Sequence, residues 1–139
     1  PGVVAFIDEL RASGVGVALG SSSKNAPLIL DRCRIADRFD AIIDGNSITF
    51  SKPDPEVFLR GAEALGSEPA RTVVFEDAVS GVQAALNGGF RVVGIGDANT
   101  LGQANFILEG NPTMVTRNTR GASGMCVPAT RTSRRPLRG

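Results

Sequence analysis

The feature that most constrains the fold is a regular alternation of short apolar segments with segments whose apolar residues repeat at helical spacing. The alternation runs from the start of the chain to about residue 110. The predicted strands are residues 15–19, 39–43, 72–75 and 91–95. The predicted helices are residues 3–10, 24–32, 55–65 and 78–87. Short, almost purely apolar strands that alternate with helices are typical of an open parallel α/β sheet with flanking helices.

Polar residues follow the predicted strands at the points where the strands end. These residues are 20–23, Asp44, Glu76 with Asp77, and Gly96 with Asp97. Right-handed crossovers place the carboxyl ends of parallel strands at one edge of a sheet, where ligands bind. We therefore expect a binding site at this edge.

The first motif is a serine-rich loop, SSSKN at residues 21–25, between an apolar strand and a helix start. Its hydroxyl groups and unpaired backbone N–H groups can bind an anion, and Lys24 adds a positive charge. Serines also cap the amino ends of helices, so simple N-capping is the alternative interpretation of this loop.

The second motif is SKPDPE at residues 51–56, in which two prolines bracket a helix start and hold Lys52 in the loop. A lysine fixed there can neutralise a transferring phosphoryl group as a point charge. The alternative interpretation is a solvated loop lysine that binds no ligand.

The third motif is the pair of carboxylates, Glu76 and Asp77, that ends the apolar strand VVF. Adjacent carboxylates repel each other unless a cation or a hydrogen-bond donor lies nearby, and Mg²⁺ prefers oxygen ligands. Equally, the pair can be a turn acid followed by the N-cap of a helix.

Taken in order, the three motifs resemble the second, third and fourth motifs of the haloacid dehalogenase (HAD) superfamily. The strings SSSKNA and VVFEDAVSGVQAALNGGFRVVGIG are similar to those of its β-phosphoglucomutase-like subfamily. The resemblance covers residues 1–110, about four-fifths of the 139-residue chain, and it implies a Rossmann-like core.

The resemblance implies a role in phosphoryl transfer for each motif. Ser21, with the backbone of Ser22, would hold the transferring phosphoryl group. Lys52 would stabilise that group, so Ser21 and Lys52 are the candidate catalytic residues. Glu76 and Asp77 would bind the implied cofactor, Mg²⁺.

The rest of the serine loop would bind the second, non-reacting phosphate of a sugar bisphosphate. The candidate substrate-binding residues are Ser21, Ser22, Ser23, Lys24, Asn25 and Lys52. A mutase must hold both phosphates in turn, which favours a phosphomutase that interconverts glucose 1-phosphate and glucose 6-phosphate through a bisphosphate. A sugar-phosphate phosphatase and a catalytically dead phosphate-binding module are the alternatives.

One element of the family's pattern is missing from these 139 residues. Members of the family carry the nucleophile and the acid–base residue in an Asp-x-Asp motif on a central strand, which a cap domain follows. The resemblance places that strand between residues 15–19 and 72–75, and no Asp-x-Asp occurs in the sequence. We therefore expect an incomplete core that lacks a nucleophile, turns over no sugar phosphate and associates through exposed sheet edges.

Residues 111–139 contain six arginines and no acidic residue, whereas residues 1–110 carry nine cationic side chains against fourteen anionic ones. The later segment has no apolar periodicity and cannot bury enough surface to offset the entropy lost on ordering. The sequence therefore predicts a partial catalytic core at residues 1–110 and a disordered, Arg- and Thr-rich tail at residues 111–139.

The composition argues against several classes of function. The absence of His excludes a histidine base and a His-ligated metal, and the absence of Trp and Tyr argues against a stacking platform for nucleic acid. No apolar run reaches the length of about 18 residues that spans a membrane. Cys33 and Cys126 lack CxxC spacing, which favours reduced thiols in a cytoplasmic protein. The expected partner is a small sugar phosphate, with no specific nucleic acid and no membrane.

Overall fold

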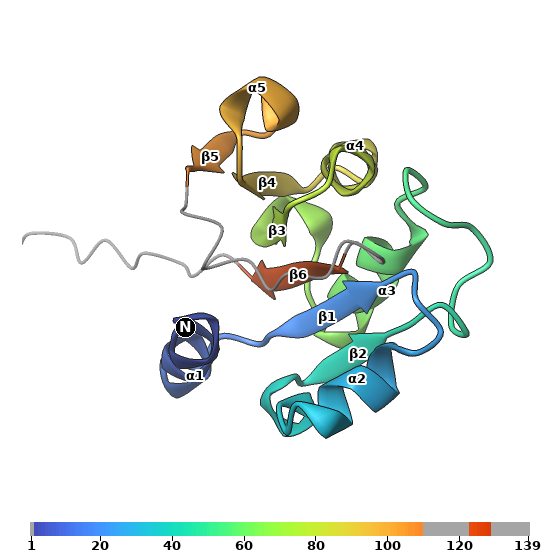
Figure 1. Ribbon diagram of the computed structural model, residues 1–139, viewed down its shortest axis with the longest axis vertical. Helices are drawn as coiled ribbons and strands as arrows, with labels where there is room; N and C mark the ends of the chain where they lie inside the picture. Colours follow the sequence, from blue (N-terminus) through green and yellow to red (C-terminus); the bar gives the residue numbers. More distant parts are fainter. Residues whose placement is uncertain (1, 110–122, 129–139) are drawn as a thin grey trace, which may run out of the picture.

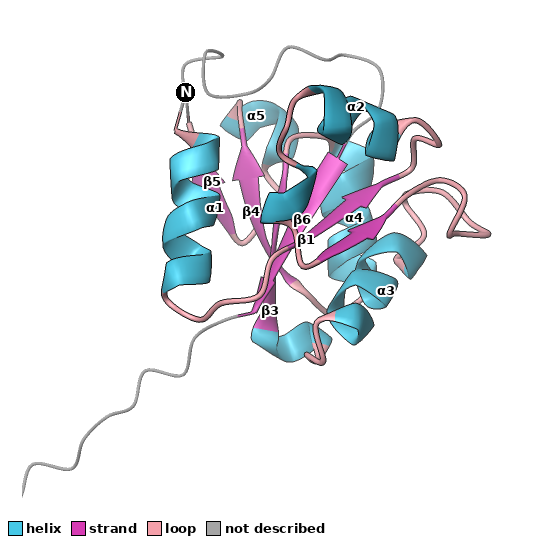
Figure 2. Ribbon diagram, turned by 90° about the horizontal axis from the view of Figure 1, so that it is seen from below, coloured by secondary structure: helices cyan, strands magenta, loops and turns pink. Residues whose placement is uncertain are grey.

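The computed structural model describes residues 2–109 and 123–128, which form a six-stranded sheet with helices on both faces (Figures 1 and 2). The strands are β1 Ala18–Ser21, β2 Ala41–Ile43, β3 Thr72–Glu76, β4 Arg91–Ile95, β5 Phe106–Leu108 and β6 Ser123–Pro128. Their order across the sheet is β2-β1-β6-β3-β4-β5. The pairs β1–β2, β3–β4 and β4–β5 are parallel, so the predicted α/β architecture is confirmed.

The helices alternate with the strands along the chain. They are α1 Val3–Ala12, α2 Ala26–Arg32, α3 Glu56–Ala64, α4 Val79–Asn87 and α5 Ala98–Leu101, with 3₁₀ turns at Ala36–Arg38 and Pro69–Arg71. The connection from β1 leads outward to β2, and the connection from β3 leads the opposite way to β4. Right-handed crossovers therefore place α2 and α4 on opposite faces of the sheet.

Two apolar clusters fill the space between the sheet and its helices. The larger lies under α3 and α4, where Phe58 and Val57 pack with Val74 and Val92. The smaller lies under α1, where Ile7 packs with Val15 and Val17. The ring of Phe6 also meets that of Phe75 edge-on, with centroids 5.5 Å apart. Both faces of the central strands are thus covered, which explains their unbroken apolar sequences.

Strand β6 differs in direction from its neighbours, because it pairs antiparallel with both β1 and β3. It occupies the position between these strands where the family resemblance places the strand that bears Asp-x-Asp. Its backbone pairs with both neighbours there, so the sheet is continuous from β2 to β5. The expected exposed edges at β1 and β3 are therefore not found, because β6 pairs with the N–H and C=O groups that these strands would otherwise expose.

The structure differs from the predicted disordered tail at residues 123–128, which form β6. The cause is physical: ladder hydrogen bonds on two sides stabilise a strand whatever its apolar periodicity. The remainder of the predicted tail lies outside the described residues. Strand β1 also begins later than predicted, at Ala18. Val15 and Val17, which precede it, are apolar because they are buried against Ile7 of α1. In the part of the chain that the structure describes, no helix is long and apolar enough to cross a membrane.

Candidate functional site

The predicted site residues lie at the carboxyl-end edge of the sheet, on the two sides of β6. Leu19 of β1 and Phe75 of β3 both pair with Met125, so they lie at one level. Ser21 stands two residues after Leu19, and Asp77 stands two residues after Phe75. Ser21 and Asp77 therefore lie at the same level at this edge of the sheet. Because neighbouring strands are about 4.8 Å apart, β1 and β3 run on the order of 10 Å from each other.

Lys52 and Glu76 form a buried ion pair at this edge. The Lys52 Nζ atom lies 2.7 Å from Glu76 Oε2, and the side chains are 4% and 0% exposed. Lys52 Nζ also lies 4.8 Å from the ring centroid of Phe58, at cation–π distance. The structure thus excludes the interpretation of Lys52 as a solvated loop lysine.

The carboxylate of Glu76 is held on both of its oxygens. Oε1 accepts hydrogen bonds from the backbone N–H groups of Asp77 at 3.0 Å and Ala78 at 3.1 Å, while Oε2 faces Lys52. Burial raises the pKa of Glu76 above its ordinary value, and the ammonium group of Lys52 works against that rise. A Cβ on Gly81 would overlap this carboxyl group, so glycine at that position lets α4 approach.

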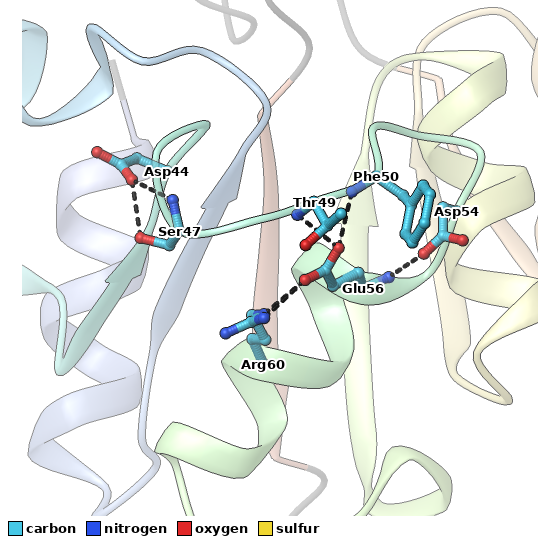
Figure 3. A network of polar contacts seen from close by, with 7 residues as sticks. All are labelled: Asp44, Ser47, Thr49, Phe50, Asp54, Glu56 and Arg60. Atoms are coloured by element: carbon cyan, nitrogen blue, oxygen red, sulfur yellow. Dashed lines mark hydrogen bonds and ion pairs between the residues drawn. The ribbon is translucent and has the colours of Figure 1, made fainter.

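The loop that carries Lys52 is anchored by Glu56 at the start of α3 (Figure 3). Glu56 Oε2 accepts hydrogen bonds from the backbone N–H groups of Thr49 and Phe50, both at 2.8 Å. Arg60 lies 2.7 Å from the other oxygen, Oε1. The N–H group of Phe50, together with these other donors, lowers the pKa of Glu56. Sequence reasoning missed Glu56 as part of the site, although it stands four residues after Lys52 in the same motif.

Residues 21–25, which we call the phosphate loop, connect β1 to α2. Ser21 is buried, with 1% of its surface exposed, and its Oγ accepts a hydrogen bond from the N–H group of Ser23 at 3.2 Å. Ser23 Oγ accepts one from the N–H group of Asn25 at 3.2 Å, whereas Asn25, the N-cap of α2, makes no side-chain cap bond. The serines therefore hold loop amides, and the predicted alternative of simple N-capping does not describe this loop.

Two side chains of the phosphate loop, those of Lys24 and Asn25, are exposed at the edge of the sheet. The hydroxyl oxygen of Ser22 is buried and has no hydrogen-bond partner within the described residues. The loop thus presents polar groups both inward and to solvent.

A second turn, residues 44–47 after β2, packs on the phosphate loop. Asp44 Oδ1 accepts a hydrogen bond from Ser47 Oγ at 2.8 Å (Figure 3). It also accepts one from the N–H group of Asn46 at 3.0 Å. The side chains of Asn46 and Ser47 lower the pKa of Asp44 below its ordinary value. Asn46 was not predicted, because its contact with the phosphate loop is to Lys24, a residue distant in the sequence.

The residues at the edge fit a magnesium ion only in part. Asp77 is exposed, and with Glu76 it offers the oxygen donors that Mg²⁺ prefers. Both oxygens of Glu76 already have partners, and no group of three or more potential metal ligands occurs among residues 2–109 and 123–128. The described residues therefore supply part of a coordination shell.

Comparison with known proteins supports the resemblance. The haloacid dehalogenase-like hydrolase family matches residues 1–89. β-Phosphoglucomutase of Bacillus subtilis is 36% identical over 109 residues, 78% of this chain and 48% of that protein. A phosphorylated carbohydrates phosphatase of Thermotoga maritima is 32% identical over 112 residues, 78% of this chain and 51% of that protein. The chain thus spans about half the length of these curated relatives.

Solved structures agree with the sequence relatives. β-Phosphoglucomutase from Clostridium difficile superposes with a TM-score of 0.77 and 31% identity, covering 82% of this chain and 51% of that one. A CbbY variant from Rhodobacter sphaeroides in complex with xylulose-(1,5)bisphosphate gives a TM-score of 0.69 and 25% identity, covering 78% of this chain and 52% of that one. The chain belongs to the haloacid dehalogenase-like hydrolases, in the β-phosphoglucomutase-like subfamily.

Proposed function

We propose that this chain carries the phosphate-binding part of a phosphotransferase that acts on small sugar phosphates. One observation carries the proposal: the ammonium group of Lys52, almost completely buried, is held at the same sheet edge as the serine-rich phosphate loop. Phosphoryl transfer depends on positioning and charge stabilisation, and a fixed cation beside fixed hydroxyl and amide donors supplies both.

In the proposed mechanism each described group has a separate task. Ser21 and the backbone of Ser22 bind the oxygens of the transferring phosphoryl group, and Lys52 neutralises charge that develops on it. Glu76 holds the Lys52 ammonium at the edge of the sheet through the ion pair of 2.7 Å. Asp77, together with Glu76, would hold Mg²⁺, which would supply further positive charge for phosphoryl transfer.

The mutase reaction is the preferred form of this proposal. Ser23, Lys24 and Asn25 lie beyond the end of β1, and the side chains of Lys24 and Asn25 are exposed where a second phosphate can reach them. The two β-phosphoglucomutases and the bisphosphate-bound CbbY variant among the similar proteins support a bisphosphate as ligand. We therefore propose interconversion of glucose 1-phosphate and glucose 6-phosphate through a bisphosphate.

A phosphatase is the second candidate, and the relative from Thermotoga maritima supports it. A third candidate, a phosphate-binding module without chemistry, is supported by the lack of Asp-x-Asp in the sequence. We propose that this chain on its own binds phosphate and does not turn over sugar phosphates. The proposal also keeps the cytoplasmic location and the small-molecule partner that the sequence predicts, without specific nucleic acid and without a membrane.

An NMR titration of the full chain tests the proposed binding site. Glucose 1,6-bisphosphate, glucose 6-phosphate and sulfate are added separately while the backbone amides are followed. The proposal predicts saturable shifts at residues 21–25 and near Lys52, and tighter binding of the bisphosphate than of either single anion. Ser21→Ala should weaken all three, whereas Ser80→Ala, an exposed serine of α4, should weaken none. Shifts confined to arginines of residues 111–139 would instead indicate nonspecific charge attraction and contradict the proposal.

A further inference from the structure

We propose that Asn46 is a positioning residue that holds the phosphate loop in its binding conformation. This inference rests on the proposed function of residues 21–25, and it concerns how the fold fixes their backbone. The turn at residues 44–47 comes from the end of β2, and it contacts the phosphate loop, which follows the neighbouring strand β1.

Two hydrogen bonds join the turn to successive carbonyl groups of the loop. The backbone N–H group of Gly45 donates to the carbonyl oxygen of Ser23 at 3.1 Å. The side-chain amide of Asn46 donates to the carbonyl oxygen of Lys24 at 3.2 Å. Because a carbonyl lies in the same plane as the next N–H group, these bonds fix the planes that carry the amides of Lys24 and Asn25.

The turn is rigid enough to serve as a template. Asp44, 9% exposed, accepts four hydrogen bonds from the turn: from the N–H groups of Asn46 and Ser47, from Ser47 Oγ, and from Asn46 Nδ2 at 3.0 Å. The two hydrogens of the Asn46 amide therefore go to Asp44 and to Lys24. Asp44 thus sets the orientation in which Asn46 reaches the loop.

The packing at Gly45 shows how closely the two segments approach. A Cβ at this position would overlap the carbonyl oxygen of Ser22 and lie 2.9 Å from the backbone nitrogen of Lys24. These are backbone atoms, which cannot rotate away as a side chain can. Within the phosphate loop, Ser21 Oγ and Ser23 Oγ each accept a bond of 3.2 Å from a loop amide, and the contacts from the turn add to this order. A loop that is already ordered loses less conformational entropy when it binds an anion.

The chain contains a matched control for Asn46. Asn99 makes the same local bonds, from its N–H group to Asp97 Oδ1 at 3.0 Å and from its Nδ2 at 3.1 Å, and Thr100 takes the place of Ser47. Asn99 follows β4, and the hydrogen bonds of its N–H group and its side-chain amide both go to Asp97. Asn46→Ala and Asn99→Ala therefore remove similar hydrogen bonds within a turn, and only Asn46→Ala also removes a bond to the phosphate loop.

The experiment uses the full chain and two readouts for both variants. In the ligand-free protein, Asn46→Ala should shift the amides of residues 22–25 and speed their hydrogen exchange, while Asn99→Ala should not. In a titration with inorganic phosphate, Asn46→Ala should raise the Kd about three- to tenfold, the effect of one hydrogen bond, while Asn99→Ala leaves it within twofold. Thermal unfolding should change to a similar extent in the two variants. Gly45→Ala should perturb the same amides as Asn46→Ala.

Two results separate failure of this inference from failure of the proposed function. If Asn46→Ala and Asn99→Ala give the same chemical shifts and exchange rates at the amides of residues 22–25 in the ligand-free protein, Asn46 does not position the loop. The inference is then overturned. If the wild-type chain binds no phosphate at residues 21–25, the proposed function fails, and the ligand-free readout still decides whether Asn46 orders the loop.

Discussion

The ammonium nitrogen of Lys52 lies 2.7 Å from a carboxylate oxygen of Glu76, and solvent reaches almost none of either side chain. The two residues come from different parts of the chain, a loop before α3 and the end of β3. Each charge therefore helps to stabilise the other in the interior. The energetic and chemical behaviour of the site follows from this dependence.

Replacing Glu76 with Gln should destabilise the fold by roughly 3–5 kcal/mol, because the buried ammonium group of Lys52 then loses the carboxylate that lies 2.7 Å away. The double variant Lys52→Met with Glu76→Gln should recover most of that loss. Urea unfolding at neutral pH measures both. Arg60→Met provides the control, since its side chain is 48% exposed and its ion pair with Glu56 should contribute less than about 1 kcal/mol. A Glu76→Gln variant as stable as the wild type would refute the dependence.

Chemical acylation should distinguish the two lysines of the chain, Lys24 and Lys52. Lys24 is exposed and should react rapidly, whereas the side chain of Lys52 is 4% exposed and should react slowly in the folded protein. Mass spectrometry of the modified peptides gives the two rates. In denaturant the rates should converge, which serves as the internal control. Equal rates under native conditions would mean that Lys52 is accessible and the buried pair is not formed.

The carboxyl group of Asp44 should titrate below its ordinary pKa of 3.8. Because its folded-state pKa is lowered, its ionised form stabilises the fold above the unfolded-state pKa, and this stabilisation is lost as the pH falls through the lowered value. Ser47→Ala removes one donor to Asp44 and should raise the pKa toward 3.8. Ser51→Ala lies in the same connection, outside the donors to Asp44, and should leave this pKa unchanged. Carbon-detected NMR titration measures the carboxyl directly; an Asp44 pKa at or above 3.8 in the wild type would count against the described turn.

The purified chain should show no turnover of β-glucose 1-phosphate primed with the 1,6-bisphosphate, with Mg²⁺ present. Transfer by this route needs a carboxylate nucleophile and a second acid to protonate the leaving oxygen. Glu76 is engaged with Lys52, and the sequence contains neither Asp-x-Asp nor His. Phosphate release and product formation are followed by coupled assay. Turnover that disappears in Asp77→Asn would show that the chain itself is active and would refute this prediction.

The local sequence pattern was sufficient to predict helices α1 to α4 and strands β1 to β4. Buried parallel strands are almost purely apolar, and helices repeat their apolar residues at helical spacing. The predicted strand at residues 91–95 coincides with β4, and the predicted helix at residues 78–87 lies within one residue of α4. Strand β5 and helix α5 were not predicted. Strand β5 is an exposed edge strand and lacks the pattern of a buried one, and the four residues of α5 are too few to show a helical period.

Tertiary contacts explain what the sequence could not predict. Two separate motifs indicated Lys52 and Glu76 as site residues. Their ion pair could not be predicted, because the two residues are distant in the sequence and only the fold brings them together. Asn46 and Glu56 act through backbone groups of other segments, and such hydrogen bonds require no recognisable partner residue. Strand β6 was missed for a related reason: its pairing is with strands far away in the chain, so no local pattern records it.

The place of β6 also determines when the sheet can close. Ala18 of β1 pairs with Cys126, a partner more than a hundred residues later in the chain. During synthesis the β2–β1 pair and the β3–β4–β5 group are therefore complete before the strand that joins them has been made. Contacts of such long sequence separation form slowly, because the entropy of closing a long loop is lost before the contact is gained. The joining of the two half-sheets is thus the last step of assembly, and until it occurs the nascent chain presents two open strand edges to chaperones and to other chains.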